Sequence, residues 1–190
     1  MSRIAIVYAT TDGQTERVCR HLARVFESVG VRTDFLRAGT VPPDFSFVGA
    51  DAVLIAGSVR MGKHQKEVTR FVRARAGELS RLRGAFLSVS LSAARDNEPA
   101  RREVHKTIAR FVEETGWKPG TVLPVAGALL YTRYGFFTRQ VMRFISRMVG
   151  GETDASRDYE YTDWEQLTAF ARTFADSLAP RQLPEHAPVA

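Results

Sequence analysis

The sequence contains only one cysteine, Cys19, among 190 residues. A single thiol forms neither an internal disulfide nor a cysteine metal cluster, which excludes a disulfide-stabilised secreted fold and favours a reducing compartment. We expect Cys19 to be buried and unreactive, because it lies beside the apolar face of a predicted helix. No apolar run approaches the roughly 18–20 residues that a membrane-spanning helix needs. The first predicted strand follows directly on residues 1–3, so we expect no signal peptide.

Two nucleotide-binding fingerprints are also missing. The chain has no Gly-x-Gly-x-x-Gly sequence for a dinucleotide, and its first polar turn has no lysine of the kind that a triphosphate site requires. Basic residues, by contrast, are in excess, with 27 Lys+Arg against 21 Asp+Glu and a formal net charge of +6. Such a balance fits nucleic acid, an anionic membrane surface or an acidic substrate.

Five apolar segments alternate with amphipathic helical segments. The predicted strands cover residues 4–9, 31–36, 52–57, 85–91 and 122–129. This alternation predicts a parallel sheet covered by helices on both faces, an α/β architecture. Five strands in this length favour a flavodoxin-like three-layer sandwich of order 2-1-3-4-5, although periodicity alone leaves the Rossmann order open.

Helix boundaries can be placed from caps and apolar stripes. The first helix is expected to bury one stripe: Val18, Leu22, Val25, Phe26 and Val29. The last helix is expected to begin at a capping box, with Thr162 as the cap and Glu165 three residues later. We therefore expect a single domain over residues 1–179, with a basic amphipathic helical insert at 131–161 after the fifth strand and a flexible tail at 180–190.

A polar turn follows the first strand and consists of Thr10, Thr11, Asp12, Gly13, Gln14 and Thr15. In an open parallel sheet, ligands bind beyond the carboxyl ends of the strands. The turn offers three hydroxyls, a glycine and a helix N-terminus, whose N–H groups and dipole favour a phosphate. Because it lacks Lys and Arg, it suits a single phosphomonoester such as that of flavin mononucleotide (FMN). An ordinary helix cap is the alternative interpretation.

This turn resembles the flavodoxin phosphate loop, Thr/Ser-x-Thr-Gly-x-Thr, with Asp12 in place of the second hydroxyl. The resemblance implies a flavin ring held by the loops after the third and fourth strands, here Ser58, Val59 and Arg60, and Ser90, Leu91 and Ser92. Electron-carrier flavodoxins usually place an aromatic residue in these loops and are acidic. The loops at 58–64 and 92–98 contain no aromatic residue. An enzyme with an open flavin face is therefore expected.

The loop after the third predicted strand also carries basic side chains. Arg60, Lys63 and His64 are candidate residues for binding acidic groups of a substrate, and a solvated basic loop is the alternative.

A stretch without acidic residues, 131–149, is both basic and apolar. Arg139, Arg143 and Arg147 repeat every four residues, and Phe137 and Phe144 lie largely on the opposite face of a predicted helix. This pattern is typical of a helix at a membrane interface, and a helix packed on its own domain fits equally well. Nucleic acid ranks below both, because no recognition motif accompanies the basic stretch.

A closer resemblance covers roughly residues 3–178. Its motifs are 11–15, 58–62, 126–129, 150–154 and 161–166, which stand in the order found in menaquinone-dependent protoporphyrinogen IX dehydrogenases. The resemblance implies FMN, oxidation of protoporphyrinogen IX to protoporphyrin IX in haem biosynthesis, and transfer of electrons to a membrane quinone (menaquinone or ubiquinone). It also implies a cytoplasmic enzyme at the inner face of the cell membrane. The alternatives are an FMN-binding electron-transfer flavodoxin and an NAD(P)H:quinone reductase; no catalytic acid, base or metal site is assigned.

Overall fold

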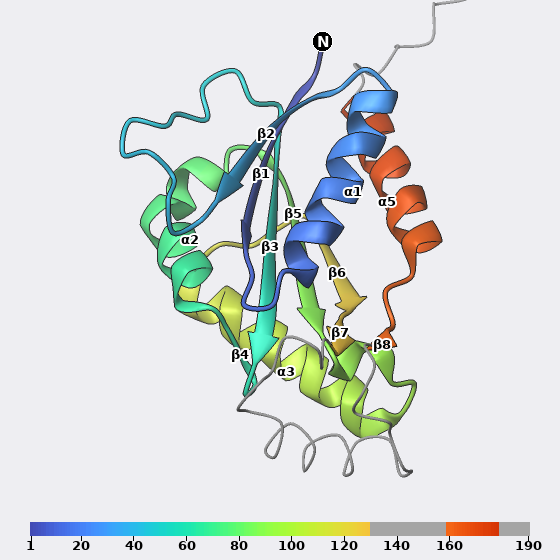
Figure 1. The fold of residues 1–190 in the computed structure, drawn as a ribbon. Helices are drawn as coiled ribbons and strands as arrows, with labels where there is room; N and C mark the ends of the chain where they lie inside the picture. Colours follow the sequence, from blue (N-terminus) through green and yellow to red (C-terminus); the bar gives the residue numbers. More distant parts are fainter. Residues whose placement is uncertain (130–158, 179–190) are drawn as a thin grey trace, which may run out of the picture.

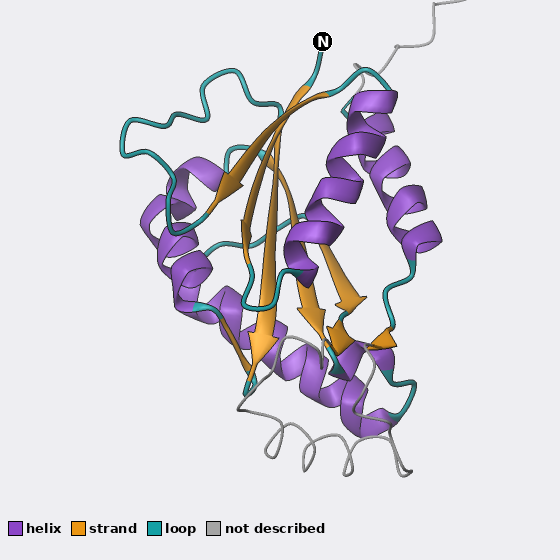
Figure 2. Cartoon of the chain, viewed as in Figure 1, coloured by secondary structure: helices purple, strands orange, loops and turns teal. Residues whose placement is uncertain are grey.

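The structure, a computed structural model, describes residues 1–129 and 159–178. A sheet lies between two layers of helices (Figure 1 and Figure 2). Its strands are β1 (Arg3–Ala9), β2 (Arg32–Arg37), β3 (Ala52–Arg60), β4 (Lys63–His64), β5 (Arg83–Ser90) and β6 (Thr121–Ala126). The described helices are α1 (Gln14–Ser28), α2 (Lys66–Leu79), α3 (Glu98–Thr115) and α5 (Trp164–Asp176), with a short 3₁₀ turn, η1 (Ser92–Ala94).

The strand order is β2-β1-β3-β5-β6, and all four of these pairings are parallel. Counted in chain order without the short β4, this is the 2-1-3-4-5 order of flavodoxin-like folds, so the predicted fold class is confirmed. Strand β4 is an addition that pairs antiparallel with the end of β3.

The central strands are buried on both faces, which explains their continuous apolar sequences. In β1, Ile4, Ile6 and Tyr8 pack under α1 and α5, while Ala5 and Val7 pack under α2 and α3. Figure 1 shows these two helix pairs on opposite sides of the sheet.

Aromatic rings join the helices to the sheet and to one another. On one face, Phe26 of α1 and Phe174 of α5 have ring centroids 6.2 Å apart. On the other, Phe86 of β5 stacks on Phe111 of α3 at 4.2 Å, and Trp117 is 1% exposed beside them. Packed side chains therefore cover both faces of the sheet.

Two predictions about the first helix have different outcomes. Cys19 is fully buried, as expected, and burial raises the pKa of its thiol. Val29 is 46% exposed, so its assignment to the buried stripe was wrong. Helix α1 ends at Ser28, Gly30 takes a positive φ of 81°, and Val31 then returns to the core before β2 begins.

The fifth predicted strand is interrupted. Residues 122–129 were expected to form one strand, but β6 ends at Ala126 and β7 (Ala128–Leu129) pairs with β8 (Tyr159–Glu160) in a separate antiparallel ladder. Gly127 lies between the two strands, and its N–H donates to the Ser90 carbonyl at 3.0 Å.

The predicted insert lies mostly outside the described residues. Its last residues, 159–161, return to the sheet edge, where the N–H of Tyr161 donates to the Gly127 carbonyl at 3.1 Å. The tail at 180–190 and the candidate membrane residues are not among the described residues: Phe137, Arg139, Arg143, Phe144 and Arg147. Within the described ranges, no helix is both long enough and apolar enough to cross a membrane.

Candidate functional site

Three loops begin at the same edge of the sheet, because the strands before them are paired in register. Ala9 of β1 lies opposite Gly57 of β3, and Gly57 lies opposite Ser88 of β5. The loop after β1, the last residues of β3 and the loop after β5 therefore meet beyond the carboxyl ends of the strands, where open α/β sheets bind ligands.

The loop after β1 has the geometry of an anion cradle. Gly13 stands at the N-cap of α1 in the left-handed region, with φ 91°, a conformation that costs little only for glycine. Its N–H donates to the Thr10 hydroxyl at 2.9 Å, which tightens the turn. The N-cap of α1 is a glycine and so has no side chain to cap the helix, and the positive end of the helix dipole faces the loop.

Thr15 supplies the test of whether a phosphate fits. Its side chain is fully buried, and its hydroxyl has no hydrogen-bond partner among the described residues. Leaving a buried hydroxyl unpaired costs about 1–3 kcal/mol. A phosphate oxygen bound at this helix N-terminus would give the hydroxyl its partner, so the residues present fit a phosphomonoester.

Gln14 contributes to the loop through its backbone, because its side chain turns toward β8. The amide donates to Glu160 Oε1 at 2.7 Å and to Thr162 Oγ1 at 2.8 Å, and Thr162 in turn donates to the Ala126 carbonyl at 2.7 Å. Arg17 adds an ion pair to Glu160 at 3.2 Å. The sequence alone did not predict this network for the Gln14 side chain.

Thr162 was assigned the wrong role, since it does not cap the last helix. Asp163 is the N-cap of α5 and accepts from the Gln166 N–H at 2.9 Å. Either residue type makes a good cap. The competing bonds of Thr162 to β6 and α1 decide between them.

Thr11 and Ser58 are linked by a residue that the sequence did not single out, Gln65. Its amide nitrogen donates to Thr11 Oγ1 at 2.8 Å and also to Ser58 Oγ. Asp12, the departure from the flavodoxin motif, is half-buried in the same loop.

The basic loop predicted at 58–64 is a hairpin. Strand β3 runs to Arg60, and Lys63 pairs with Arg60 across a two-residue turn. The turn residues Met61 and Gly62 have φ values of 50° and 70°, as a tight hairpin turn requires. Arg60 and Lys63 are both exposed at this end of the sheet, where the prediction placed them.

His64 does not lie in an open loop, and its assignment to substrate binding was wrong. The residue is 9% exposed, its Nε2 is 3.0 Å from Ser88 Oγ, and its ring packs 5.0 Å from Phe111 and 5.1 Å from Phe86. Burial lowers its pKa to about 4, so the imidazole is neutral at pH 7. It belongs to the core between β4 and α3.

The residues at the end of β5 and just after it form hydrogen bonds with nearby residues. Ser90 is 9% exposed and its hydroxyl accepts from the Ala93 N–H at 3.2 Å. Leu91 is half-buried, and the Ser92 hydroxyl donates to Glu103 at 3.1 Å. Val59 of β3, also half-buried, lines a small cavity together with Ser90 and Ser92.

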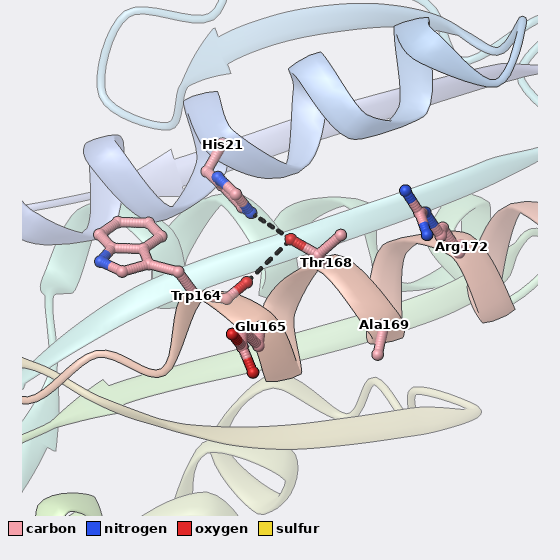
Figure 3. A pocket seen from close by; sticks show the side chains of 6 residues that line it. All are labelled: His21, Trp164, Glu165, Thr168, Ala169 and Arg172. Atoms are coloured by element: carbon pink, nitrogen blue, oxygen red, sulfur yellow. Dashed lines mark hydrogen bonds between the residues drawn. The ribbon is translucent and has the colours of Figure 1, made fainter.

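A larger hollow of about 320 Å³ lies on the outer face of α1 and α5 (Figure 3). It is lined by His21, Trp164, Glu165, Thr168, Ala169 and Arg172. His21 Nε2 is 2.8 Å from Thr168 Oγ1, which joins the two helices at its floor. Because this hollow lies between helices and not beyond the strand ends, we do not assign the phosphate site to it.

Comparison with known proteins agrees with this geometry. The model of a flavodoxin domain family matches residues 5–156. A short-chain flavodoxin associated with a bacterial microcompartment has a TM-score of 0.59 at 14% identity, covering 94% of this chain and all of its own. A flavodoxin of Streptococcus pneumonia TIGR4 has a TM-score of 0.55 at 18% identity, covering 93% and 99%. At these identities the structures support the fold alone.

Curated relatives are closer in sequence. The protoporphyrinogen IX dehydrogenase (quinone) of Escherichia coli strain K12 is 33% identical over 170 residues, covering 90% of this chain and 93% of that protein. The protein of the same name from Leishmania major is 36% identical over 174 residues, covering 90% and 73%. The resemblance read from the motifs is thereby confirmed. With its flavodoxin strand order and this similarity over most of its length, the chain belongs to the protoporphyrinogen IX dehydrogenase (quinone) family of flavodoxin-like proteins.

Proposed function

We propose that this protein is an FMN-dependent oxidoreductase that converts protoporphyrinogen IX to protoporphyrin IX and passes the electrons to a membrane quinone. The observation that carries the proposal is the loop 10–15, with a left-handed glycine, Gly13, at the N-terminus of α1 and a buried Thr15 hydroxyl that has no partner among the described residues. Family membership adds the substrate and the acceptor, since its curated relatives are named for both.

The chain's own residues have distinct roles in holding FMN. Thr10, Gly13 and Thr15 would hold the phosphate, with the dipole of α1 offsetting its negative charge. The ends of β3 and β5, at Ser58–Arg60 and Ser90–Ser92, would flank the ring. When bound, FMN would supply the redox chemistry: it would accept electron pairs from the substrate and pass them on to the quinone.

Substrate recognition follows from size and charge. The absence of aromatic residues at 58–64 and 92–98 leaves one face of the ring uncovered for a bulky tetrapyrrole. Arg60 and Lys63, exposed on the hairpin, fit the two propionates of a porphyrinogen as charge-assisted partners. His64 is excluded from this role by its burial.

Delivery of electrons to a quinone requires access to lipid. We assign this to the insert, whose Phe137 and Phe144 would meet the bilayer while Arg139, Arg143 and Arg147 meet anionic headgroups. The protein would then work in the cytoplasm, at the inner face of the cell membrane.

Two measurements test the proposal. The purified protein should show the visible absorption of an oxidised flavin, or gain it when FMN is added. Without oxygen, protoporphyrinogen IX and a menaquinone analogue should then give a quinone-dependent rise in porphyrin fluorescence. A protein that binds no FMN contradicts the cofactor assignment. FMN binding with rapid oxidation of reduced nicotinamide, and no porphyrin, would instead favour a quinone reductase.

A further inference from the structure

The side chain of Gln65 joins the phosphate loop to the end of β3. Its amide nitrogen reaches Thr11, 54 positions away, at 2.8 Å, and Ser58, on the far side of the β3–β4 hairpin. In the proposed function, the two hydroxyls belong to loops that would bind different parts of FMN. One loop faces the phosphate, and the other flanks the ring.

Local structure does not explain a glutamine at this position. Gln65 is the N-cap of α2, where Ser, Thr, Asp and Asn are favoured because their short side chains reach the first N–H groups. The Gln65 side chain makes no capping bond. Helix α2 uses only its backbone carbonyl, which accepts from the Thr69 N–H at 3.2 Å and from the Thr69 hydroxyl at 3.1 Å.

One end of the amide is also left without a partner. Gln65 Oε1 is buried and makes no hydrogen bond within the described residues. Serine and threonine hydroxyls both donate and accept, so either end of the amide can serve Thr11 and Ser58. Whichever end bonds the two hydroxyls, the other end remains a buried polar group without a hydrogen bond beside the two loops. Burying such a group costs free energy, and a ligand that bonds to it would remove that cost.

We propose that Gln65 positions FMN by fixing the spacing of the phosphate loop and the ring loop, and that its unpartnered amide end meets the hydroxyl-bearing chain that joins phosphate to ring. This inference rests on the proposed function. It makes Gln65 a specificity residue for a ligand that spans both loops. A ligand that occupies one loop alone does not depend on the bridge.

The test compares three ligands on the full-length protein, from which bound flavin has been dialysed. Calorimetric titration with FMN, riboflavin and inorganic phosphate is carried out for wild type, Gln65→Leu and Gln65→Asn. The asparagine keeps the amide but is one methylene too short for the bridge. Both variants should weaken FMN binding roughly 10- to 100-fold and phosphate binding less than about threefold. Gln166→Leu, at an exposed position of α5, is the matched control and should bind FMN like wild type.

A charge-switch variant separates positioning from folding. In Gln65→Glu, the protonated carboxyl keeps one donor and an acceptor, where the amide has two N–H donors and an acceptor, whereas the carboxylate has acceptors only. Its FMN affinity relative to wild type should therefore recover as the pH falls. A purely structural role would not produce that recovery.

The outcomes distinguish this inference from the proposed function. If wild type binds no FMN, both are overturned. If wild type binds FMN and Gln65→Leu binds it as tightly, only the role of Gln65 is overturned. An equal loss for FMN and for inorganic phosphate also overturns it, since the defect would then lie in the phosphate loop alone.

Discussion

The side-chain amide of Gln14 donates to the carboxylate of Glu160 at 2.7 Å, although the two residues are 146 positions apart. Gln14 is the first residue of α1, directly after the proposed phosphate cradle, and Glu160 ends β8. The cradle is therefore attached to the part of the chain that follows residues 130–158. Its shape depends on a long-range contact as well as on its own turn.

Breaking this attachment at Thr162 should destabilise the fold. Thr162→Val removes the hydroxyl that accepts from Gln14 and donates to the Ala126 carbonyl, and it leaves that buried region short of a partner. We expect the free energy of unfolding in urea to fall by about 1–3 kcal/mol. Thr173→Val, at an exposed position of α5, should change it by less than about 0.5 kcal/mol. Equal effects of the two variants would refute the importance of the network.

Thr15→Val should change stability and binding in opposite directions. The valine is nearly isosteric and removes an unpartnered buried hydroxyl, so the flavin-free protein should be equally stable or about 1 kcal/mol more stable. FMN affinity, measured by fluorescence quenching, should fall about tenfold or more, because the phosphate loses a donor. An unchanged affinity would show that Thr15 does not contact the phosphate.

Thr115→Val provides the contrast for that experiment. Thr115 is equally buried, but its hydroxyl donates to the Phe111 carbonyl at 2.7 Å. We expect this variant to lose stability, measured by urea unfolding, and to keep its FMN affinity.

His64 should make stability depend on pH in a defined window. Its pKa is lowered to about 4 by burial, from an ordinary value of about 6.5 in the unfolded chain. Between these values the unfolded state binds more protons, so the free energy of unfolding falls as the pH is lowered from about 6.5 to about 4. The loss is of the order of 3 kcal/mol.

Urea unfolding at several pH values checks this prediction. His64→Gln should flatten the pH dependence in that window, whereas His105→Gln, at an exposed position of α3, should leave it in place. A wild-type stability that is constant from pH 6.5 to pH 4 would contradict the buried, neutral imidazole.

Charge reversal in the basic insert should weaken membrane binding. Arg139, Arg143 and Arg147 each contribute about 1 kcal/mol near an anionic surface. Changing all three to Glu removes this attraction and adds repulsion, so the affinity for anionic liposomes, measured by co-sedimentation, should fall by about 100-fold or more.

The control for this experiment carries the same change of net charge elsewhere on the chain. It replaces with Glu three exposed arginines of the described helices: Arg24, Arg70 and Arg102. If the control loses binding as strongly as the insert variant, the effect is one of net charge, and the insert is not the membrane-contacting element.

The fold could be predicted because the sequence patterns that specify its strands and helices are local. Continuous apolar runs such as 4–9 and 52–57 identify strands buried on both faces, and the helical stripes between them fix the alternation. The cradle at 10–15 could be found for the same reason, since its hydroxyls, its glycine and the helix start are contiguous.

What escaped prediction depends on pairings between distant segments. His64 reads as a loop residue until β4 pairs with β3 and turns its ring under the sheet. Thr162 and Asp163 are equally good caps, and the distant partners of Thr162, Gln14 and the Ala126 carbonyl, decide between them. Gln65 gave a weak local signal, a long amide at a position that favours short side chains.

The ladder between β7 and β8 has a consequence for how such proteins diversify. Leu129 pairs with Tyr159, so residues 130–158 connect two positions that are paired with each other in this two-stranded ladder. Lengthening a connection between two fixed ends costs little, about 0.6 kcal/mol for each doubling of its length. A lineage can therefore shorten, extend or exchange residues 130–158 without rebuilding the scaffold, and the rung from Leu129 to Tyr159 is a natural graft point for new sequences.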